Sequence, residues 1–156
     1  MKRYLVAPML IAVDQLLRLA AHATYARDSS SQFGWFGLGR LQNPFILDPF
    51  EIGSIGLTIA IVIFALELTT WPDWKFTAMS LNILAAGAVS NLAESVLRGF
   101  STDYILLFFA PGDWLAINLA DVFIAVGLVL SVLSIPRLLK TLVWTNAETT
   151  IDSSAK

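Results

Sequence analysis

Four long apolar runs constrain this chain more than any other feature of its sequence. A helix that crosses a bilayer needs about 20 mostly apolar residues. Four runs meet that requirement, at residues 4–23, 52–70, 76–97 and 115–135, and Pro136 is expected to help end the last one. Only helices or closed barrels satisfy the backbone in lipid, and these runs are too long and continuous for barrel strands. The sequence therefore predicts an all-α membrane protein with four transmembrane helices.

Composition supports a lipid environment and excludes several kinds of site. The chain is 56% hydrophobic and 14% charged, whereas soluble domains carry about 25% charged residues. A net charge of −2 provides no strong field to recruit nucleic acid. There is no cysteine and one histidine, His22, so we expect no thiol nucleophile, no Ser-His-Asp triad, and neither metal nor cofactor. Carboxylates are therefore the expected agents of any catalysis.

The connections between the runs predict one membrane domain and a tail. Residues 1–144 are expected to form the four-helix domain, and the polar residues 145–156 a disordered tail. The long connection 24–51 is rich in Ser, Gly, Pro and aromatic residues. Its 33–39 portion (FGWFGLG) predicts a small extended or β-like segment at a membrane interface. Residues 70–75 predict a tight turn, and Pro111-Gly112 marks a turn in the third connection.

Basic residues near the ends of the runs predict the orientation in the membrane. With the N-terminus inside, six Lys and Arg residues lie on the inner side: Lys2, Arg3, Lys75, Arg137, Lys140 and Lys156. Three lie on the outer side: Arg27, Arg40 and Arg98. This bias favours a cytoplasmic location for both termini. It also places the first and third connections on the outer face.

Acids within or near the apolar runs are the candidates for function, because charges inside a membrane are costly. In the predicted orientation four acids converge near the outer face: Asp14, Glu94, Asp103 and Asp121. Helical spacing predicts an ion pair between Asp14 and Arg18, and another between Glu94 and Arg98, four residues apart in each case. These two acids are therefore candidates for a structural role.

Asp103 and Asp121 differ from the other acids because neither has a basic residue within one helical turn. Two close carboxylates cannot easily both ionise, so one keeps a proton while the other acts as a base. Such a pair can activate water for attack on an amide and protonate the carbonyl oxygen or the leaving amine. The residues alone leave open whether the two meet. A proton relay in a transport subunit is an alternative.

Four short motifs follow one another along the chain. They are 13–18 (VDQLLR), 42–45 (QNPF), 86–95 (AGAVSNLAES) and 118–121 (NLAD). Nine residues separate Glu94 of the third motif from Asp103. In this order, each on the expected helix or connection, the motifs resemble those of the aspartic lipoprotein signal peptidases, the signal peptidase II family.

The resemblance implies an intramembrane aspartic endopeptidase of the bacterial inner membrane. Such an enzyme removes signal peptides from diacylglyceryl-modified prolipoproteins, so its partners would be that substrate and membrane lipids, and we expect a monomer. Asp103 and Asp121 would be the catalytic pair, with the active site at the outer face. Five polar residues would shape the site and bind the substrate: Asp14, Asn43, Asn91, Glu94 and Asn118.

The chain also departs from the family pattern. The usual Asp-Arg pair of the third motif is Glu94-Ser95, and Ser90 stands where a glycine is usual. Arg98, one turn later, is the candidate to replace the lost arginine. These departures leave an alternative open, a catalytically impaired paralogue that binds lipoprotein precursors or lipid.

Overall fold

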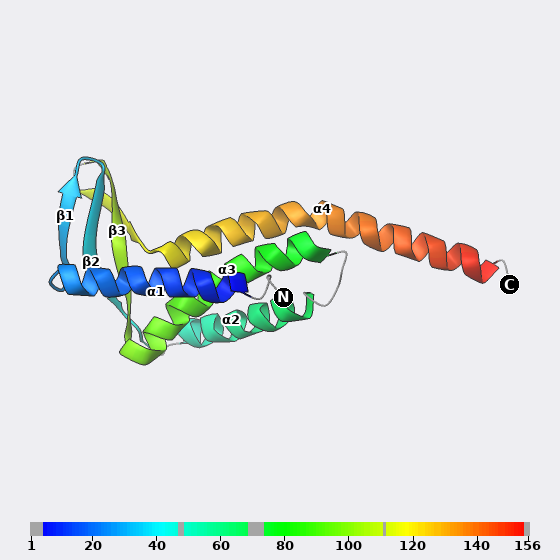
Figure 1. Ribbon diagram of the computed structural model, residues 1–156, viewed down its shortest axis with the longest axis horizontal. Coiled ribbons are helices and arrows are strands. Elements are labelled where there is room, and N and C mark those ends of the chain that lie inside the picture. Colours follow the sequence, from blue (N-terminus) through cyan, green and yellow to red (C-terminus); the bar gives the residue numbers. More distant parts are fainter. Residues whose placement is uncertain (1–4, 47–48, 69–73, 111, 155–156) are drawn as a thin grey trace.

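The computed structural model describes residues 5–46, 49–68, 74–110 and 112–154. Its elements, in chain order, are α1 (Val6–Thr24), β1 (Ser29–Phe33), β2 (Phe36–Pro44), α2 (Pro49–Leu68), α3 (Lys75–Arg98), β3 (Phe100–Ala110), β4 (Asp113–Ile117) and α4 (Leu119–Ser154). The helices lie side by side and the sheet lies at one end of the bundle (Figure 1).

Within the described residues, four helices are long and apolar enough to cross a membrane. The first three begin and end within a few residues of the predicted runs, which confirms that part of the prediction. Helix α3 is central, because it packs against α1, α2 and α4. The second helix begins at Pro49, a residue that suits the first helical position because its missing N–H would have no partner there.

Two glycines allow α3 and α4 to pack closely. A Cβ atom at Gly87 would lie 2.3 Å from the carbonyl oxygen of Ala120, and one at Gly127 would lie 2.4 Å from the backbone nitrogen of Leu84. Any larger side chain would therefore push the two helices apart. This close contact places the middle of α3 beside the first turn of α4.

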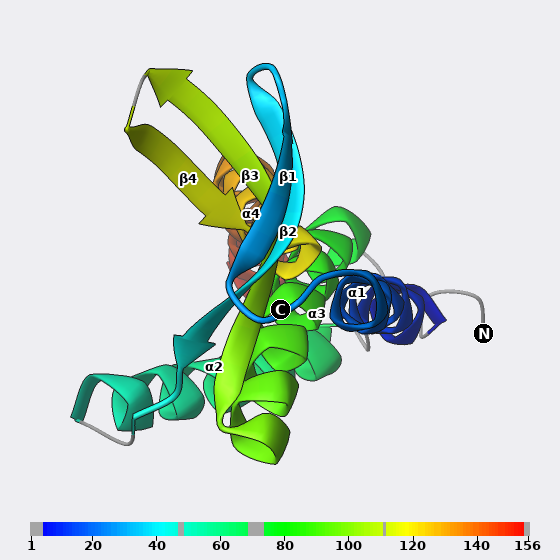
Figure 2. The ribbon, with the colours of Figure 1, turned by 90° about the vertical axis from the view of Figure 1, so that its left-hand side faces the viewer.

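A four-stranded antiparallel sheet covers one end of the bundle, with strand order β1-β2-β3-β4 (Figure 2). Strands β1 and β2 form a hairpin in which Phe33 pairs with Phe36, and Gly34 adopts a φ of +68° at the turn. This hairpin confirms the predicted extended segment in the connection 24–51. Strands β3 and β4 come from the third connection, for which the sequence predicted a turn but no strands.

Helix α4 corrects three expectations. It begins at Leu119 rather than Leu115, because residues 113–117 form β4. It continues through Pro136 to Ser154, where we expected a stop and then a disordered tail. A proline removes one backbone hydrogen bond, and the leucines and lysine that follow it are good helix formers. Lys2, Arg3, most of the turn 70–75, and Pro111 lie outside the described residues.

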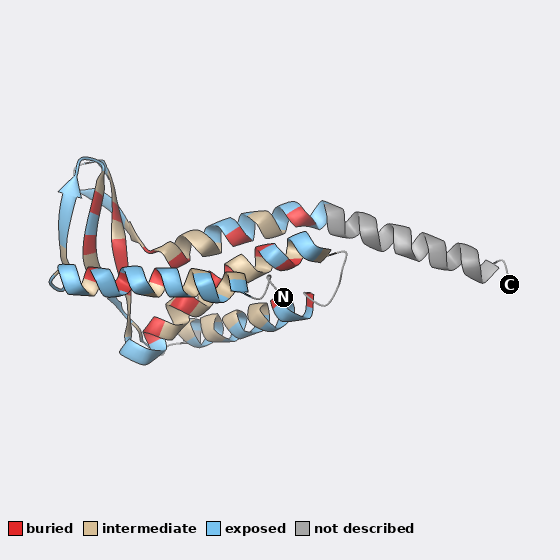
Figure 3. Ribbon diagram, in the orientation of Figure 1, coloured by how far each residue is buried: buried red, intermediate tan, exposed pale blue. Residues whose placement is uncertain are grey.

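Burial is inverted relative to a soluble protein. Exposed and intermediate positions predominate along α1, α2 and the described part of α4 (Figure 3). Large apolar side chains such as Leu16, Ile63 and Leu133 are more than 60% exposed. Many of the fully buried side chains are instead polar or charged: Arg18, Glu94, Asn118, Thr102, Asp14, Ser80, Ser90 and Ser134. An apolar exterior around a polar interior is what a lipid solvent favours.

Candidate active site

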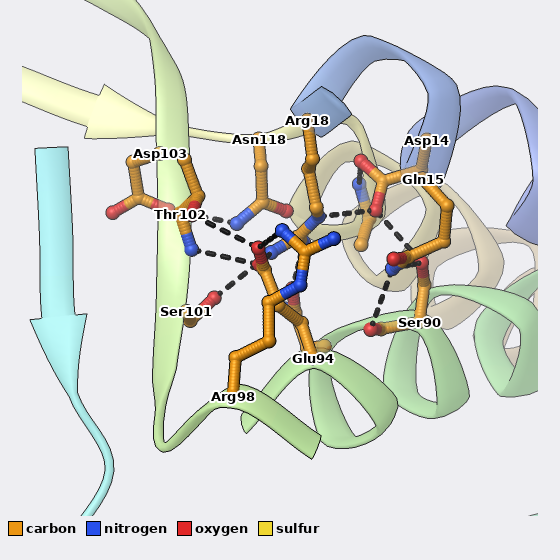
Figure 4. Close-up of polar contacts among 12 residues, drawn as sticks. Asp14, Gln15, Arg18, Ser90, Glu94, Arg98, Ser101, Thr102, Asp103 and Asn118 are labelled. Carbon is orange, nitrogen blue, oxygen red and sulfur yellow. Dashed lines mark hydrogen bonds and ion pairs between the residues drawn. The ribbon is translucent and has the colours of Figure 1, made fainter. Parts of the chain in front are cut away.

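The buried polar residues gather where the helix bundle meets the sheet. Helices α1, α3 and α4 and strand β3 contribute the side chains, which point toward one another (Figure 4). The bundle end that carries the sheet therefore also carries the candidate site. The opposite end of the bundle holds the start of α1, the end of α2 and the start of α3 (Figure 1).

Arg18 is the central cation of this region. Its Nε donates to Asp14 Oδ2 at 2.7 Å, its Nη1 donates to Glu94 Oε2, and its Nη2 donates to Asn91 Oδ1. The side chains of Asp14, Arg18 and Glu94 are all fully buried. Because an uncompensated buried charge is strongly destabilising, one rigid guanidinium that serves two carboxylates makes their burial possible. The predicted pair of Asp14 with Arg18 is confirmed.

Glu94 has further donors from β3 and from its own helix. The backbone N–H of Thr102 donates to Oε2 at 2.8 Å, and the Thr102 hydroxyl donates to Oε1 at 2.9 Å. Arg98 Nη1 lies 3.4 Å from Oε1, so the predicted pair of Glu94 with Arg98 also forms. Arg98 contacts Glu94 from the partly exposed side, whereas Arg18 occupies the buried position.

Ser90, the residue that replaces the usual glycine, joins the same network. Its hydroxyl donates to Asp14 Oδ2 at 2.7 Å and accepts from Gln15 Nε2 at 3.0 Å. Ser90 is fully buried. This departure therefore adds a satisfied hydrogen bond between α1 and α3 rather than a clash.

The first turn of α4 is held by Asp14 and Tyr104. The Tyr104 hydroxyl donates to Asp14 Oδ1 at 2.9 Å and accepts from the Leu119 N–H at 3.0 Å. The Ala120 N–H also donates to Asp14 Oδ1, at 3.2 Å. A buried carboxylate at the start of a helix satisfies free N–H groups and interacts favourably with the helix dipole. Burial raises the pKa of Tyr104 well above its ordinary value, so the hydroxyl remains a donor.

Asn118 and Asp121 complete the N-terminus of α4 as a reciprocal pair. The Asp121 N–H donates to Asn118 Oδ1 at 3.0 Å, and the Asn118 N–H donates to Asp121 Oδ2 at 3.0 Å. This is the arrangement of a capping box, here with Asn and Asp. Asn91 of α3 adds a third contact, because its Nδ2 donates to Asp121 Oδ1 at 2.8 Å.

Asp103 lies on β3 and is held by two asparagines. Asn118 Nδ2 donates to its Oδ1 at 2.7 Å, and Asn43 Nδ2 donates to its Oδ2 at 2.6 Å. Asn43 pairs with Ser101 across the β2–β3 ladder, which places it diagonally from Asp103 on the same face of the sheet. Asp103 is 6% exposed. Burial, with an added contribution from the nearby Asp121 charge, raises the pKa of Asp103 to about 6.

The structure brings together all seven residues that the sequence singled out: Asp14, Asn43, Asn91, Glu94, Asp103, Asn118 and Asp121. Asn118 links the two unpaired acids, since its side chain contacts Asp103 and its backbone contacts Asp121. Within the described part of the chain, neither of these two acids forms an ion pair.

Several members of the network were not predicted. Tyr104, Thr102 and Ser101 lie on a strand that the sequence did not reveal, and the bond from Arg18 to Glu94 spans 76 residues. His22 Nε2 lies 2.9 Å from the Thr102 hydroxyl, and its ring stacks on Phe100 with centroids 5.8 Å apart. The polar residues of β3 were the available signal, because Ser101, Thr102 and Asp103 interrupt an otherwise apolar run.

The fold and the site define a class, a polytopic helical membrane protein with a buried carboxylate cluster at the sheet-bearing end of its bundle. The chain belongs to the signal peptidase II family, whose model matches residues 6–137. Family membership and the four apolar helices make it a protein of the bacterial inner membrane.

Curated relatives named lipoprotein signal peptidase come from Brucella ovis and Brucella canis. Each is 34% identical to this chain over 77 residues, a region that covers 48% of this chain and 48% of the relative. The chain thus spans about half the length of the curated relatives it matches.

Two solved structures of bacterial membrane enzymes share the fold, each with a TM-score of 0.71. One is 21% identical and covers 86% of this chain and 92% of its own. The other is 22% identical and covers 90% of this chain and 89% of its own. At these identities the likeness concerns the fold.

Proposed function

We propose that this protein is an intramembrane aspartic endopeptidase that removes signal peptides from diacylglyceryl-modified prolipoproteins. One observation carries the proposal beyond family membership. Asp103 and Asp121, which lack basic partners in the sequence, are joined through Asn118. Two adjacent carboxylates without a counter-charge are suited to hold one proton between them.

In the proposed mechanism Asp103 is the acid and Asp121 the base. A pKa raised to about 6 keeps Asp103 protonated up to mildly acidic pH, well above the range in which an ordinary aspartate loses its proton. Asp121 takes a proton from a water molecule, whose oxygen attacks the scissile carbonyl while Asp103 protonates the carbonyl oxygen. The tetrahedral intermediate then collapses, the C–N bond breaks, and the proton held by Asp121 passes to the leaving amine. Asp103 recovers its proton from the intermediate's hydroxyl.

The other site residues would support this chemistry in two ways. Asn43, Asn91 and Asn118 hold the two acids at hydrogen-bond distance and offer amide groups to a substrate backbone. Asp14 and Glu94 are positioning residues, because Asp14 fixes the first turn of α4 and Glu94 fixes strand β3. We place the sheet-bearing end of the bundle at the outer face and both termini in the cytoplasm, following the excess of basic residues, and we expect a monomer in contact with lipid.

A gel-shift cleavage assay in detergent tests the proposal. The substrate would be a diacylglyceryl-modified prolipoprotein, and the variants Asp103→Asn and Asp121→Asn would be compared with the parent. We expect cleavage by the parent and a loss of at least about 100-fold in each variant. Asp28→Asn is the control, because Asp28 is exposed, its ion pair with Arg27 lies at the surface, and an asparagine keeps an oxygen that can accept from the Gln42 N–H. Turnover retained in both dyad variants would contradict the assignment.

The alternative of a catalytically impaired paralogue arose because the third motif has Ser95 where the family pattern has an arginine. Glu94 nevertheless contacts two arginines, Arg18 and Arg98, so the network around it is charge-compensated. Binding of the lipid-modified precursor by a folded parent that yields no product would return us to that alternative.

A further inference from the structure

Strand β2 carries two buried donor atoms that have no hydrogen-bond partner. They are Nε of Arg40 and Nε2 of Gln42, and among the described residues no other buried side-chain nitrogen or oxygen is left without a partner. A buried donor without an acceptor is costly, and a buried cation without a counter-charge is more so. Because the two residues lie two apart on one strand, the same acceptor from outside the chain could serve both.

Both residues lie near His22, at the end of α1. Gln42 pairs with Thr102 across the β2–β3 ladder, so their side chains share one face of the sheet. The Thr102 hydroxyl lies 2.9 Å from His22 Nε2. The charges of Arg40 and Arg98 both act on the His22 ring. The unpaired donors therefore belong to one polar, positively charged region between the end of α1, strand β2 and the end of α3.

The nearby acids Glu94 and Asp28 have other partners. Arg40 is half-buried and forms no ion pair with a described residue. Glu94 already contacts two other arginines. Asp28 accepts from the Gln42 N–H at 3.2 Å and pairs with Arg27. The charge of Arg40 is therefore uncompensated within the described chain, and an anion from outside would balance it.

Phosphate is the anion that this arrangement suits. A planar guanidinium presents a fork of N–H groups that matches two phosphate oxygens, and a primary amide adds a donor for a third. The depth of the region indicates where such a phosphate comes from. His22 lies in the last turn of α1, and the apolar span of α1 ends at Thr24. The region therefore lies at the level of the lipid headgroups.

We propose that this region binds the phosphate of an anionic phospholipid, with Arg40 as its main ligand and Gln42 as a second donor. Arg98, whose side chain is 32% exposed, adds to the positive potential that attracts the headgroup. Gln42 precedes Asn43, whose amide holds Asp103, so a bound lipid would also fix the strand next to that acid. The proposal concerns binding and does not depend on peptidase activity.

Native mass spectrometry of the purified full chain in a neutral detergent tests the proposal. Phosphatidylglycerol and phosphatidylcholine with the same acyl chains are titrated separately, and an apparent Kd is measured for each. The parent should bind phosphatidylglycerol about tenfold more tightly. Arg40→Gln should lose that preference, and Gln42→Leu should weaken it. Arg27→Gln is the matched control, because it removes an arginine that has its own counter-charge, and it should keep the preference.

Thermal unfolding of the same proteins gives a second measurement, which also shows whether the variants fold. In lipid-free detergent, Arg40→Gln should unfold at a temperature no lower than that of the parent, because it removes an uncompensated charge. Added phosphatidylglycerol should raise the midpoint of the parent and of Arg27→Gln but not that of Arg40→Gln, since a ligand stabilises only the folded state that binds it.

The inference is wrong if the parent shows no preference for phosphatidylglycerol, or if Arg40→Gln keeps the parent's preference. A third titration, with sodium phosphate against sodium chloride of equal ionic strength, separates the two sources of phosphate. Sodium phosphate that raises the midpoint of the parent but not of Arg40→Gln, without any preference between the lipids, would reject the phospholipid and leave a site for free phosphate.

Discussion

Two pairs of acids lie at the same end of this molecule but have different partners. Asp14 and Glu94 share the guanidinium of Arg18 and are fully buried with it; we call these three residues the ion-paired cluster. Asp103 and Asp121 are held by asparagine amides and form no ion pair among the described residues; we call them the amide-held pair. The clusters are connected, because Asp14 binds the first turn of the helix that carries Asp121.

In the proposed mechanism the ion-paired cluster serves the fold and the amide-held pair serves the chemistry. The charges of Asp14 and Glu94 are compensated by the shared guanidinium and by several hydrogen-bond donors, so the ion-paired cluster can hold the helices and the sheet together. For Asp103, burial and then the nearby charge of Asp121 raise the pKa to about 6, although the amides of Asn118 and Asn43 oppose that rise. The predictions below separate these two roles.

The largest effect is expected from removing the shared cation. Arg18→Met leaves two buried carboxylates without a counter-charge, which should cost about 3–5 kcal/mol of folding stability. The thermal unfolding midpoint of the purified variant in detergent measures the loss. Arg27→Met is the control, since Arg27 is 70% exposed and its ion pair with Asp28 lies at the surface. A parent-like midpoint for Arg18→Met would show that the cluster is not structural.

The next largest effect concerns the helix contact that joins the two clusters. Gly87→Ala places a Cβ 2.3 Å from the Ala120 oxygen, so α4 must shift. We expect a loss of about 1–3 kcal/mol and slower cleavage, because Asn91 and Asp121 separate. Gly56→Ala on α2 is the matched control, since no atom lies within 4 Å of its added Cβ. Equal midpoints and rates in the two variants would argue against a tight α3–α4 contact.

A smaller effect is expected at the hydroxyl between the two clusters. Tyr104→Phe removes the donor to Asp14 and the acceptor for the Leu119 N–H. Each lost hydrogen bond costs about 1 kcal/mol, so both stability and kcat should fall modestly, with KM unchanged. Tyr25→Phe provides the comparison, because Tyr25 follows the last residue of α1 and its hydroxyl bonds to no other described residue. A fall in KM alone would contradict a positioning role.

The smallest effect is a shift in pH dependence. If Asp103 is the acid, kcat/KM should fall as the pH rises through about 6 and the proton is lost. The Asn43 amide stabilises the ionised form of Asp103. Asn43→Ala should therefore raise the pKa of Asp103 further and move the fall in kcat/KM to higher pH, by at most about one unit. A pH–rate profile of both proteins measures the shift. A fall in kcat/KM that moves to lower pH in the variant would exclude Asp103 as the acid.

The four spans and the identity of the candidate acids could be predicted from the sequence because both are local properties. Apolar length reveals a membrane helix, and an acid in such a helix stands out. Pairs four residues apart, such as Asp14 with Arg18, follow from helical geometry. The hairpin of β1 and β2 was visible through its glycines and aromatic residues.

Contacts between distant segments could not be predicted in the same way. After Asp103 the sequence of β3 is a short apolar run, which periodicity cannot distinguish from a buried helix segment. Its pairing with β2 is a long-range contact, and so is the bond of Tyr104 to Asp14 across 90 residues. The extent of α4 could not be predicted for another reason. Pro136 predicts a stop, whereas the helix continues through it to Ser154.

One paired measurement on Asp103→Asn tests the division of roles most directly: the unfolding midpoint and the cleavage rate of the same preparation. The account predicts no detectable cleavage and a midpoint much closer to that of the parent than to that of Arg18→Met, because the variant loses one hydrogen bond from an amide but leaves no buried charge unpaired. A variant that unfolds as readily as Arg18→Met while it still cleaves the precursor would contradict the account.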